Sequence, residues 1–244
     1  GDNDKNNPET ILAINYDGVQ TQNFGGTTYL INAAIGGTMN AADYGVPNGG
    51  WGGNRSRSPL PLQFGDFQNS ADKRALFFGS TTAIENVNTF TEGVAVIKFN
   101  NKTSTGATPA SVGGAYTSTD FPLFRLAEQH LIYAEAVLRG GAGSNATALG
   151  YVNALRERAY GNASANLSSI SLEDVFKERS KELYWEGFRR TDLIRYSRFV
   201  DASYVWPWKG GTANGRAAEA FRNLYPLPAA DVIANVNLNQ NSGY

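Results

Sequence analysis

The chain has 244 residues and a formal net charge of −1, so it can bury one large core or two modest ones, and its charge gives no electrostatic basis for binding nucleic acid. Because it contains no cysteine and a single histidine, disulfides, thiolate metal sites and histidine-cluster metal sites are excluded. Glycine, asparagine and aromatic residues are frequent, which suits polyhydroxylated ligands but is equally typical of a chain with many turns.

Three short segments in the first part of the chain are candidates for strands. Residues 10–17, TILAINYD, contain an apolar stretch suited to a short strand. Residues 29–34 fit a second strand, although an alanine-rich helix is the alternative. Residues 93–99, GVAVIKF, give the clearest strand pattern in the chain.

Polar segments between these candidates predict long loops. Residues 36–61 are dominated by Gly, Asn, Pro and Ser, and residues 100–119 are also polar. Loops of this length are uncommon and are often functional. Between them we expect a brief ordered element at 71–78, with Asp72 and Arg74 forming a structural ion pair.

From residue 120 onward the pattern changes to helix. Two apolar stripes at three- and four-residue spacing predict two helices, the first ending at Gly140-Gly141 and the second capped by Ser144 or Asn145. The small residues on these stripes make the pair similar to a tetratricopeptide-type hairpin. His130 is interpreted as a helix residue beside the core with its hydrogen bonds satisfied.

The run from Glu173 to Phe199 predicts one long third helix, capped near Ser171. Its glutamates at 178, 182 and 186 recur every four residues on one face, with arginines and lysines interleaved. At this spacing Glu182 and Glu186 would stand about 5–6 Å apart, close to the separation that a retaining glycosidase requires. However, carboxylates paired with basic neighbours keep a lowered pKa, whereas a catalytic acid needs a raised one. We therefore interpret this helix as a structural strut and expect no catalytic residues.

Residues 44–57, YGVPNGGWGGNRSR, form the first candidate ligand-binding segment. Trp51 lies between two Gly-Gly pairs, which have no side chains to cover it, so its indole can stack on a sugar face. Neighbouring side chains offer donors and acceptors for hydroxyl groups. The alternative is that Trp51 plugs the side of the helical region. The candidate residues here are Tyr44, Asn48, Trp51, Asn54, Arg55 and Arg57.

Trp206 and Trp208 form the second candidate, because alternate residues of an extended segment face the same way. They could provide another stacking platform or a contact surface for a partner. The alternative is that the two rings anchor their own loop to the body of the protein. No phosphate-binding loop or dinucleotide fingerprint occurs among the glycines, and we expect no cofactor and no metal.

Three blocks resemble the SusD/RagB family of surface glycan-binding lipoproteins of Bacteroidota. ERSKELYWEGFRRTDLIRY (178–196) is similar to the family's signature. FPLFRLAEQHLIYAEAVLRGG (121–141), followed by ALGYVNALRERAYG (148–161), resembles its late helical pair, and YPLPAADVIANVNLNQNSGY (225–244) resembles its closing segment. The blocks occur in order and cover roughly the last half of the chain; before residue 119 the likeness is thin.

The resemblance implies a mainly α, SusD-like fold with a helical hairpin, a long helix, long loops and a few short strands. We expect a loop-rich, ligand-binding region at 1–119 and a helical region with a docked tail at 120–244. The resemblance also implies a non-catalytic protein that captures oligosaccharides and delivers them to a SusC-like TonB-dependent transporter at the outer membrane.

Family members carry a lipidated N-terminal cysteine and a helical N-terminal half, and neither is present in this chain. We therefore expect it to correspond to the C-terminal part of a longer protein, with the other half as a partner. Three alternatives stay open: a RagB-like peptide-binding protein, a glycoside hydrolase, and a transporter-facing scaffold that binds nothing alone.

Overall fold

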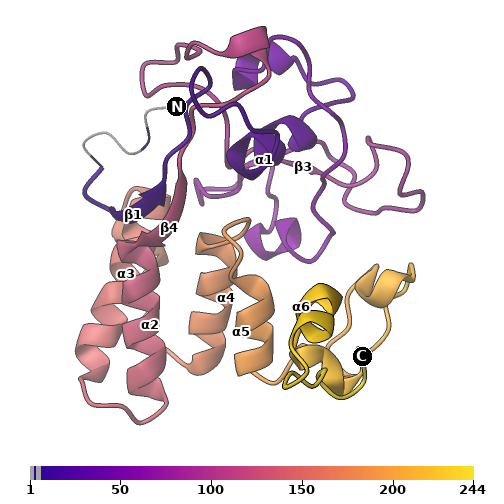
Figure 1. The fold of residues 1–244 in the computed structure, drawn as a ribbon. Helices are drawn as coiled ribbons and strands as arrows, with labels where there is room; N and C mark the ends of the chain where they lie inside the picture. The colour runs from indigo at the N-terminus through magenta and orange to yellow at the C-terminus, as the bar shows by residue number, and fades with distance from the viewer. Residues whose placement is uncertain (1–2, 4–6) are drawn as a thin grey trace. The chain divides into compact units, whose positions relative to one another are not determined.

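The computed structural model describes Asn3 and residues 7–244, and the chain divides into two compact units, Gly1–Gly187 and Phe188–Tyr244. The first unit contains the elements β1 (Thr10–Ile14), α1 (Gly26–Ala34), β2 (Phe77–Phe78), β3 (Ala95–Val96), β4 (Phe121–Arg125), α2 (Leu126–Leu138), α3 (Asn145–Tyr160) and α4 (Leu172–Glu182) (Figure 1). The second contains α5 (Arg189–Arg195) and α6 (Ala229–Ala234). The predicted mainly α class with long loops and a few short strands is confirmed.

In the described part of the chain, no helix combines the length and the apolar character that crossing a bilayer requires.

Helices α2 and α3 form the predicted antiparallel hairpin, and α4 lies beside α2 (Figure 1). Small and branched side chains such as Ala134 on α2 and Val152 on α3 are fully buried along the predicted stripes. The Ser144 hydroxyl accepts a hydrogen bond from the Thr147 N–H at 3.0 Å, so the predicted cap of α3 is confirmed. Ser171 caps α4 in the same way, with a reciprocal bond from its own N–H to Asp174.

The single helix predicted over 173–199 is wrong, because α4 ends at Glu182 and α5 begins only at Arg189. Between them Trp185 has a left-handed φ of +63°. The cause is a tertiary contact: the Lys98 ammonium donates to the carbonyls of Glu182 at 2.8 Å and Tyr184 at 2.9 Å. A helix end with such an external partner for its carbonyls can stop without a free-energy penalty.

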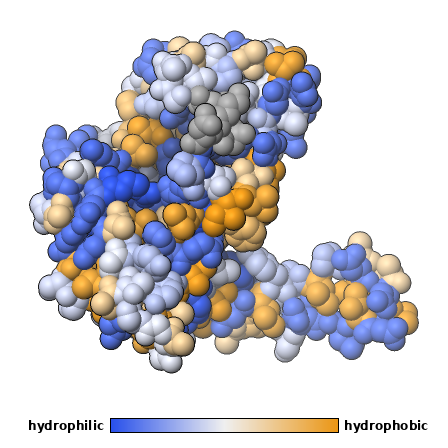
Figure 2. All heavy atoms as spheres, turned by 90° about the vertical axis from the view of Figure 1, so that its left-hand side faces the viewer, coloured by the Kyte–Doolittle hydropathy of each residue, from blue (hydrophilic) through white to orange (hydrophobic). Residues whose placement is uncertain are grey.

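The strand predictions are confirmed only in part. β1 lies within 10–17 and pairs antiparallel with β4, an unpredicted strand at the point where helix was expected. The clear pattern at 93–99 yields only the two-residue strand β3, paired with β2. Residues 29–34 belong to helix α1, which was the alternative. Apolar side chains of β1 and β4 reach the surface, and Figure 2 shows apolar residues among polar ones on that side.

Helix α1 forms the centre of a small core in the loop-rich part of the first unit. Ile31 and Ile35 on one side of α1 pack with Val46 and Ala95, and all four are buried. Gly50 passes so close to this helix that a Cβ there would lie 2.1 Å from the Ile35 carbonyl oxygen. The predicted long loop at 36–61 is therefore folded tightly against α1.

Replacing Gly50 with alanine is expected to lower the free energy of unfolding by about 1–3 kcal/mol, since the new methyl group must displace backbone. Gly150 is the matched control, because it lies inside α3 with nothing within 4 Å of its Cβ position. Gly150→Ala is expected to stabilise by about 0.5–1 kcal/mol. Urea denaturation of both variants measures the two effects, and equal effects would contradict the close approach at Gly50.

Candidate functional site

Backbone hydrogen bonds attach the loop at 51–54 to the C-terminal end of α1. The N–H of Trp51 donates to the Asn32 carbonyl at 2.7 Å, and the next three N–H groups donate to the Ile35 and Ala33 carbonyls at 2.6–2.9 Å. Carbonyls at a helix C-terminus have no partner within the helix, so they are available to an incoming chain. The glycines around Trp51 therefore serve to bring its backbone against α1.

Four aromatic rings gather around this loop, and we call them the aromatic surface: Phe24, Tyr29, Trp51 and Tyr116. The Trp51 ring centroid lies 6.1 Å from Phe24 and 6.3 Å from Tyr29, and Phe24 lies 5.0 Å from Tyr116. Phe24, Tyr29 and Trp51 are 59%, 46% and 44% exposed. Trp51 is therefore not a core plug; it is one member of a solvent-facing group of rings.

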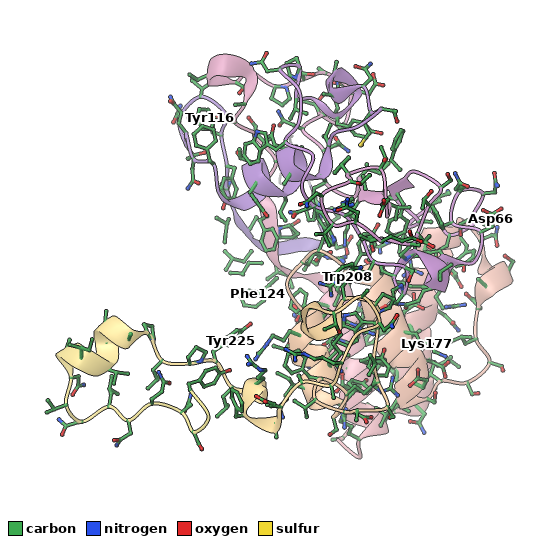
Figure 3. The ribbon with its side chains drawn as sticks, turned by 90° about the vertical axis from the view of Figure 1, so that its right-hand side faces the viewer. Asp66, Tyr116, Phe124, Lys177, Trp208 and Tyr225 are labelled. Atoms are coloured by element: carbon green, nitrogen blue, oxygen red, sulfur yellow. The ribbon has the colours of Figure 1, made fainter. Side chains whose placement is uncertain are left out.

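The rings of the aromatic surface are tilted against one another by 40–56°. Aromatic rings supply large apolar contact areas with little entropy to lose. A set of successively tilted rings can contact a ligand that curves, whereas coplanar rings suit a flat one. Tyr116 lies among the loops of the first unit, away from Phe124 on β4 (Figure 3).

Polar side chains from the predicted segment border these rings. Asn54 accepts a hydrogen bond from the Tyr29 hydroxyl at 3.2 Å, which places its amide beside the rings. The exposed Asn48 donates to the Gly113 carbonyl and so ties its loop to the segment that carries Tyr116. Tyr44 is half-buried and packs against the core beneath α1.

The two predicted arginines differ in surroundings. The Arg55 guanidinium donates to the carbonyls of Val87, Thr89 and Glu92 at 2.5–2.6 Å, so it holds the 87–92 loop. Arg57 is exposed. Of the two, Arg57 has the side chain that is available to a ligand.

Trp206 and Trp208 lie in the second unit and are half-buried. Trp206 packs edge-on to Tyr204, with ring centroids 6.1 Å apart, and the Lys209 ammonium lies 4.5 Å from its ring centroid. Lys209 itself donates to the Tyr204 carbonyl at 2.6 Å. These contacts hold the loop together, and a ligand role for Trp206 and Trp208 stays a prediction.

The sequence pointed to Trp51 and Asn54 but not to Phe24, Tyr29 or Tyr116. Tyr116 is separated from Trp51 by 65 positions in the printed sequence, so no local pattern joins them. Phe24 precedes Gly25-Gly26 as Trp51 precedes Gly52-Gly53, and this shared aromatic-Gly-Gly pattern is the signal that could have found it.

The acidic residues of the predicted strut enter one connected network of ion pairs. Glu182 contacts Arg74 at 3.0 Å, Arg125 at 2.7 Å and Arg158 at 2.5 Å. Glu178 and Glu186 are also paired with basic side chains outside their own segment, and Glu9 links Arg125 to Arg158. The sequence predicted mutual ion pairs at three- and four-residue spacing within one helix. The structure instead pairs Glu182 with arginines of other segments, Arg74, Arg125 and Arg158.

The electrostatics of Glu182 exclude it as a general acid. Burial by itself would raise the pKa of this carboxyl, but the three surrounding arginines outweigh burial and hold its pKa well below the ordinary value. The carboxylate therefore stays ionised, whereas a glycosidase acid must carry a proton.

Arg74 and the buried Asp72 form the predicted ion pair, with a nitrogen–oxygen distance of 2.8 Å. The interpretation of His130 as fully hydrogen-bonded is wrong: its Nδ1 is buried without a partner among the described residues. The His130 ring instead stacks on Tyr151, with centroids 4.3 Å apart, so packing determines its position. Within the described part of the chain, no group of three His, Asp or Glu side chains could hold a metal ion.

Comparisons with known proteins agree on one family. The sequence profile of the SusD family matches residues 47–244. The whole chain is 34% identical to starch-binding protein SusD of Bacteroides thetaiotaomicron and covers 51% of it. SusD-like protein P2 of Formosa agariphila is 34% identical over 55% of the chain, which covers 28% of that protein. The chain thus spans about half or less of the length of these curated relatives.

Solved structures show the same fold. Surface glycan-binding protein A from Bacteroides thetaiotaomicron in complex with laminarihexaose superposes with a TM-score of 0.70 at 20% identity, over 96% of this chain and 52% of that one. A SusD superfamily protein from Bacteroides vulgatus gives 0.66 at 22% identity, over 97% and 46%.

Proposed function

This chain belongs to the SusD family, and from that premise we propose that it is part of a non-catalytic protein that captures oligosaccharides at the cell surface. The observation that carries the proposal is the aromatic surface, with three well-exposed rings and the Asn54 amide beside them. Rings contact the C–H faces of sugars, and amides bond their hydroxyl groups. The names of two similar proteins, one starch-binding and one glycan-binding, support the same ligand class.

The proposed capture site consists of Phe24, Tyr29, Trp51 and Tyr116, with Asn48, Asn54 and Arg57 at its border. Tyr44 packs against the core next to the site, and Arg55 holds the neighbouring 87–92 loop. Trp206 and Trp208 are proposed as a further contact surface. A protein that only captures ligand must release it for uptake. We therefore include in the proposal delivery to a SusC-like TonB-dependent transporter, with the whole protein lipid-anchored at the outer membrane.

Affinity gel electrophoresis of the chain tests the proposal. Native gels containing amylose or laminarin are expected to retard the chain, because the tilted rings match glycans that curve along their length. Gels containing soluble cellulose derivatives are expected to retard it less. No retardation by any of a broad panel of glycans would contradict the proposal.

A parallel assay for new reducing ends tests the non-catalytic part. We expect none after prolonged incubation of the chain with the retained glycan. New reducing ends released by the wild-type chain would instead establish a hydrolase.

A further inference from the structure

A pocket of about 360 Å³ opens beside the ion-pair network of the first unit, and nothing in the proposed function uses it. This volume falls within the range of small-molecule sites. Its wall combines charged groups with apolar surfaces from Phe99, Pro122 and Tyr184. The carboxylates that line it are Glu182 and Glu186, and the basic side chains are Lys73, Arg74, Lys98, Arg125, Arg158 and Lys181.

Positive charge exceeds negative charge around this pocket. Among the described residues, the network joins the five carboxylates of Glu9, Asp72, Glu178, Glu182 and Glu186 to six basic side chains: Arg74, Lys98, Arg125, Arg156, Arg158 and Lys181. Lys73 adds a further positive charge and forms no ion pair with a described residue. The pocket therefore carries cations that the protein's own carboxylates do not balance.

Lys181 shows where the excess charge is located. Its ammonium has one carboxylate partner among the described residues, Asp72 at 3.7 Å, and that carboxylate is already bound at 2.8 Å by Arg74. Burial, and then the positive charge of Arg74, lower the pKa of Lys181 despite the attraction of Asp72. Burial also lowers the pKa of Lys98, because the effect of burial is larger than that of the pairing with Glu186. Both lysines would gain from another anion.

We propose that this pocket binds an acidic sugar, with its carboxylate or sulfate group on Lys73 and Lys181 and its C–H face against Phe99 and Pro122. An oxyanion pairs with ammonium and guanidinium groups through charge-assisted hydrogen bonds. A sugar ring supplies the apolar face that a bare inorganic anion lacks, which fits the aromatic part of the wall. The site depends on the charges of this pocket and is separate from the aromatic surface.

Titration calorimetry of the chain at constant ionic strength tests the proposal, with glucuronate, glucose and sodium sulfate as probes. We expect glucuronate to bind, sulfate to compete with it, and glucose to give no heat. Binding of sulfate with no binding of glucuronate would overturn the acidic-sugar assignment in favour of a free anion. No binding of either anion, or equal binding of glucose, would overturn the site itself.

Lysine substitutions test whether glucuronate binds in this pocket. Lys73→Gln, at an exposed position that should not affect folding, and Lys181→Gln are each expected to weaken glucuronate binding about tenfold. Lys177→Gln is the matched control on the same helix, because Lys177 is exposed and does not line the pocket (Figure 3). Equal losses in Lys73→Gln and Lys177→Gln would overturn the proposal, since they indicate general charge screening.

Trp51→Ala separates this inference from the proposed function. It is expected to keep full glucuronate binding while it loses neutral glycan. If the wild-type chain binds glucuronate but no neutral glycan, the result supports the pocket and contradicts only the aromatic surface. Loss of glucuronate binding in Trp51→Ala would overturn the pocket assignment.

Discussion

Glu182→Gln is expected to lower the free energy of unfolding by about 3–5 kcal/mol, because it removes one buried charge and leaves its partners behind. Three arginine side chains contact this carboxylate at 2.5–3.0 Å, and the side chain of Glu182 is almost fully buried. The three guanidiniums would stay buried without the negative charge that offsets their desolvation. Urea denaturation at pH 7 measures the loss.

Glu173→Gln is the matched control for this prediction. Glu173 lies in the same helix, but its side chain is 42% exposed, and it pairs with the exposed Lys177 at 3.7 Å. We expect a change within about 0.5 kcal/mol. If Glu182→Gln cost no more than this control, the ion-pair network would not be a main source of stability.

The wild-type chain is also expected to lose stability in acid through Glu182. The pKa of this group is lower in the folded than in the unfolded chain, so its contribution is complete above the ordinary value of 4.5 and falls as the pH drops below it. Glu182→Gln should therefore flatten the stability profile below about pH 4.5. Parallel profiles for wild type and variant would contradict the lowered pKa.

Trp51→Ala is expected to weaken glycan binding roughly 30-fold, the equivalent of the ~2 kcal/mol that defines a central aromatic contact. The indole lies within ring-contact distance of both Phe24 and Tyr29, so its loss divides the aromatic surface. Because Trp51 is 44% exposed, the free energy of unfolding should fall by less than the ~3–5 kcal/mol typical of a buried aromatic. Affinity gels and urea denaturation measure the two effects.

Phe124→Ala is the matched control for Trp51→Ala. Phe124 is 46% exposed on β4 and makes no contact with the four rings of the aromatic surface. It should leave glycan retention unchanged. Equal loss of binding in both variants would assign the effect to general surface hydrophobicity, and a stability loss of 3–5 kcal/mol in Trp51→Ala would make Trp51 a core residue.

Local signals in the sequence were sufficient for the helical hairpin. Ser144 and Ser171 cap their helices through bonds to residues three positions away, which a sequence pattern can show. The break after Glu182 was not predictable in this way, because the side chains that donate to the Glu182 carbonyl are Arg125 and Lys98, 57 and 84 positions distant in sequence. Helix propensity alone predicts that the helix continues through Trp185.

The candidate site shows the same division between local and distant contacts. Trp51 was found because its flanking glycines are adjacent in sequence. Tyr29 and Tyr116 were missed because only the folding of separate segments brings their rings to Trp51 and Phe24. Arg55 was predicted as a ligand donor from its residue type, whereas the structure directs its guanidinium to carbonyls of a loop more than 30 positions away.

The four backbone hydrogen bonds that join residues 51–54 to the end of α1 have a thermodynamic consequence for recognition. A loop that is fixed before the ligand arrives has little conformational freedom to surrender, so more of the contact energy appears as affinity. Its amide protons should accordingly exchange with solvent more slowly than those of an ordinary surface loop.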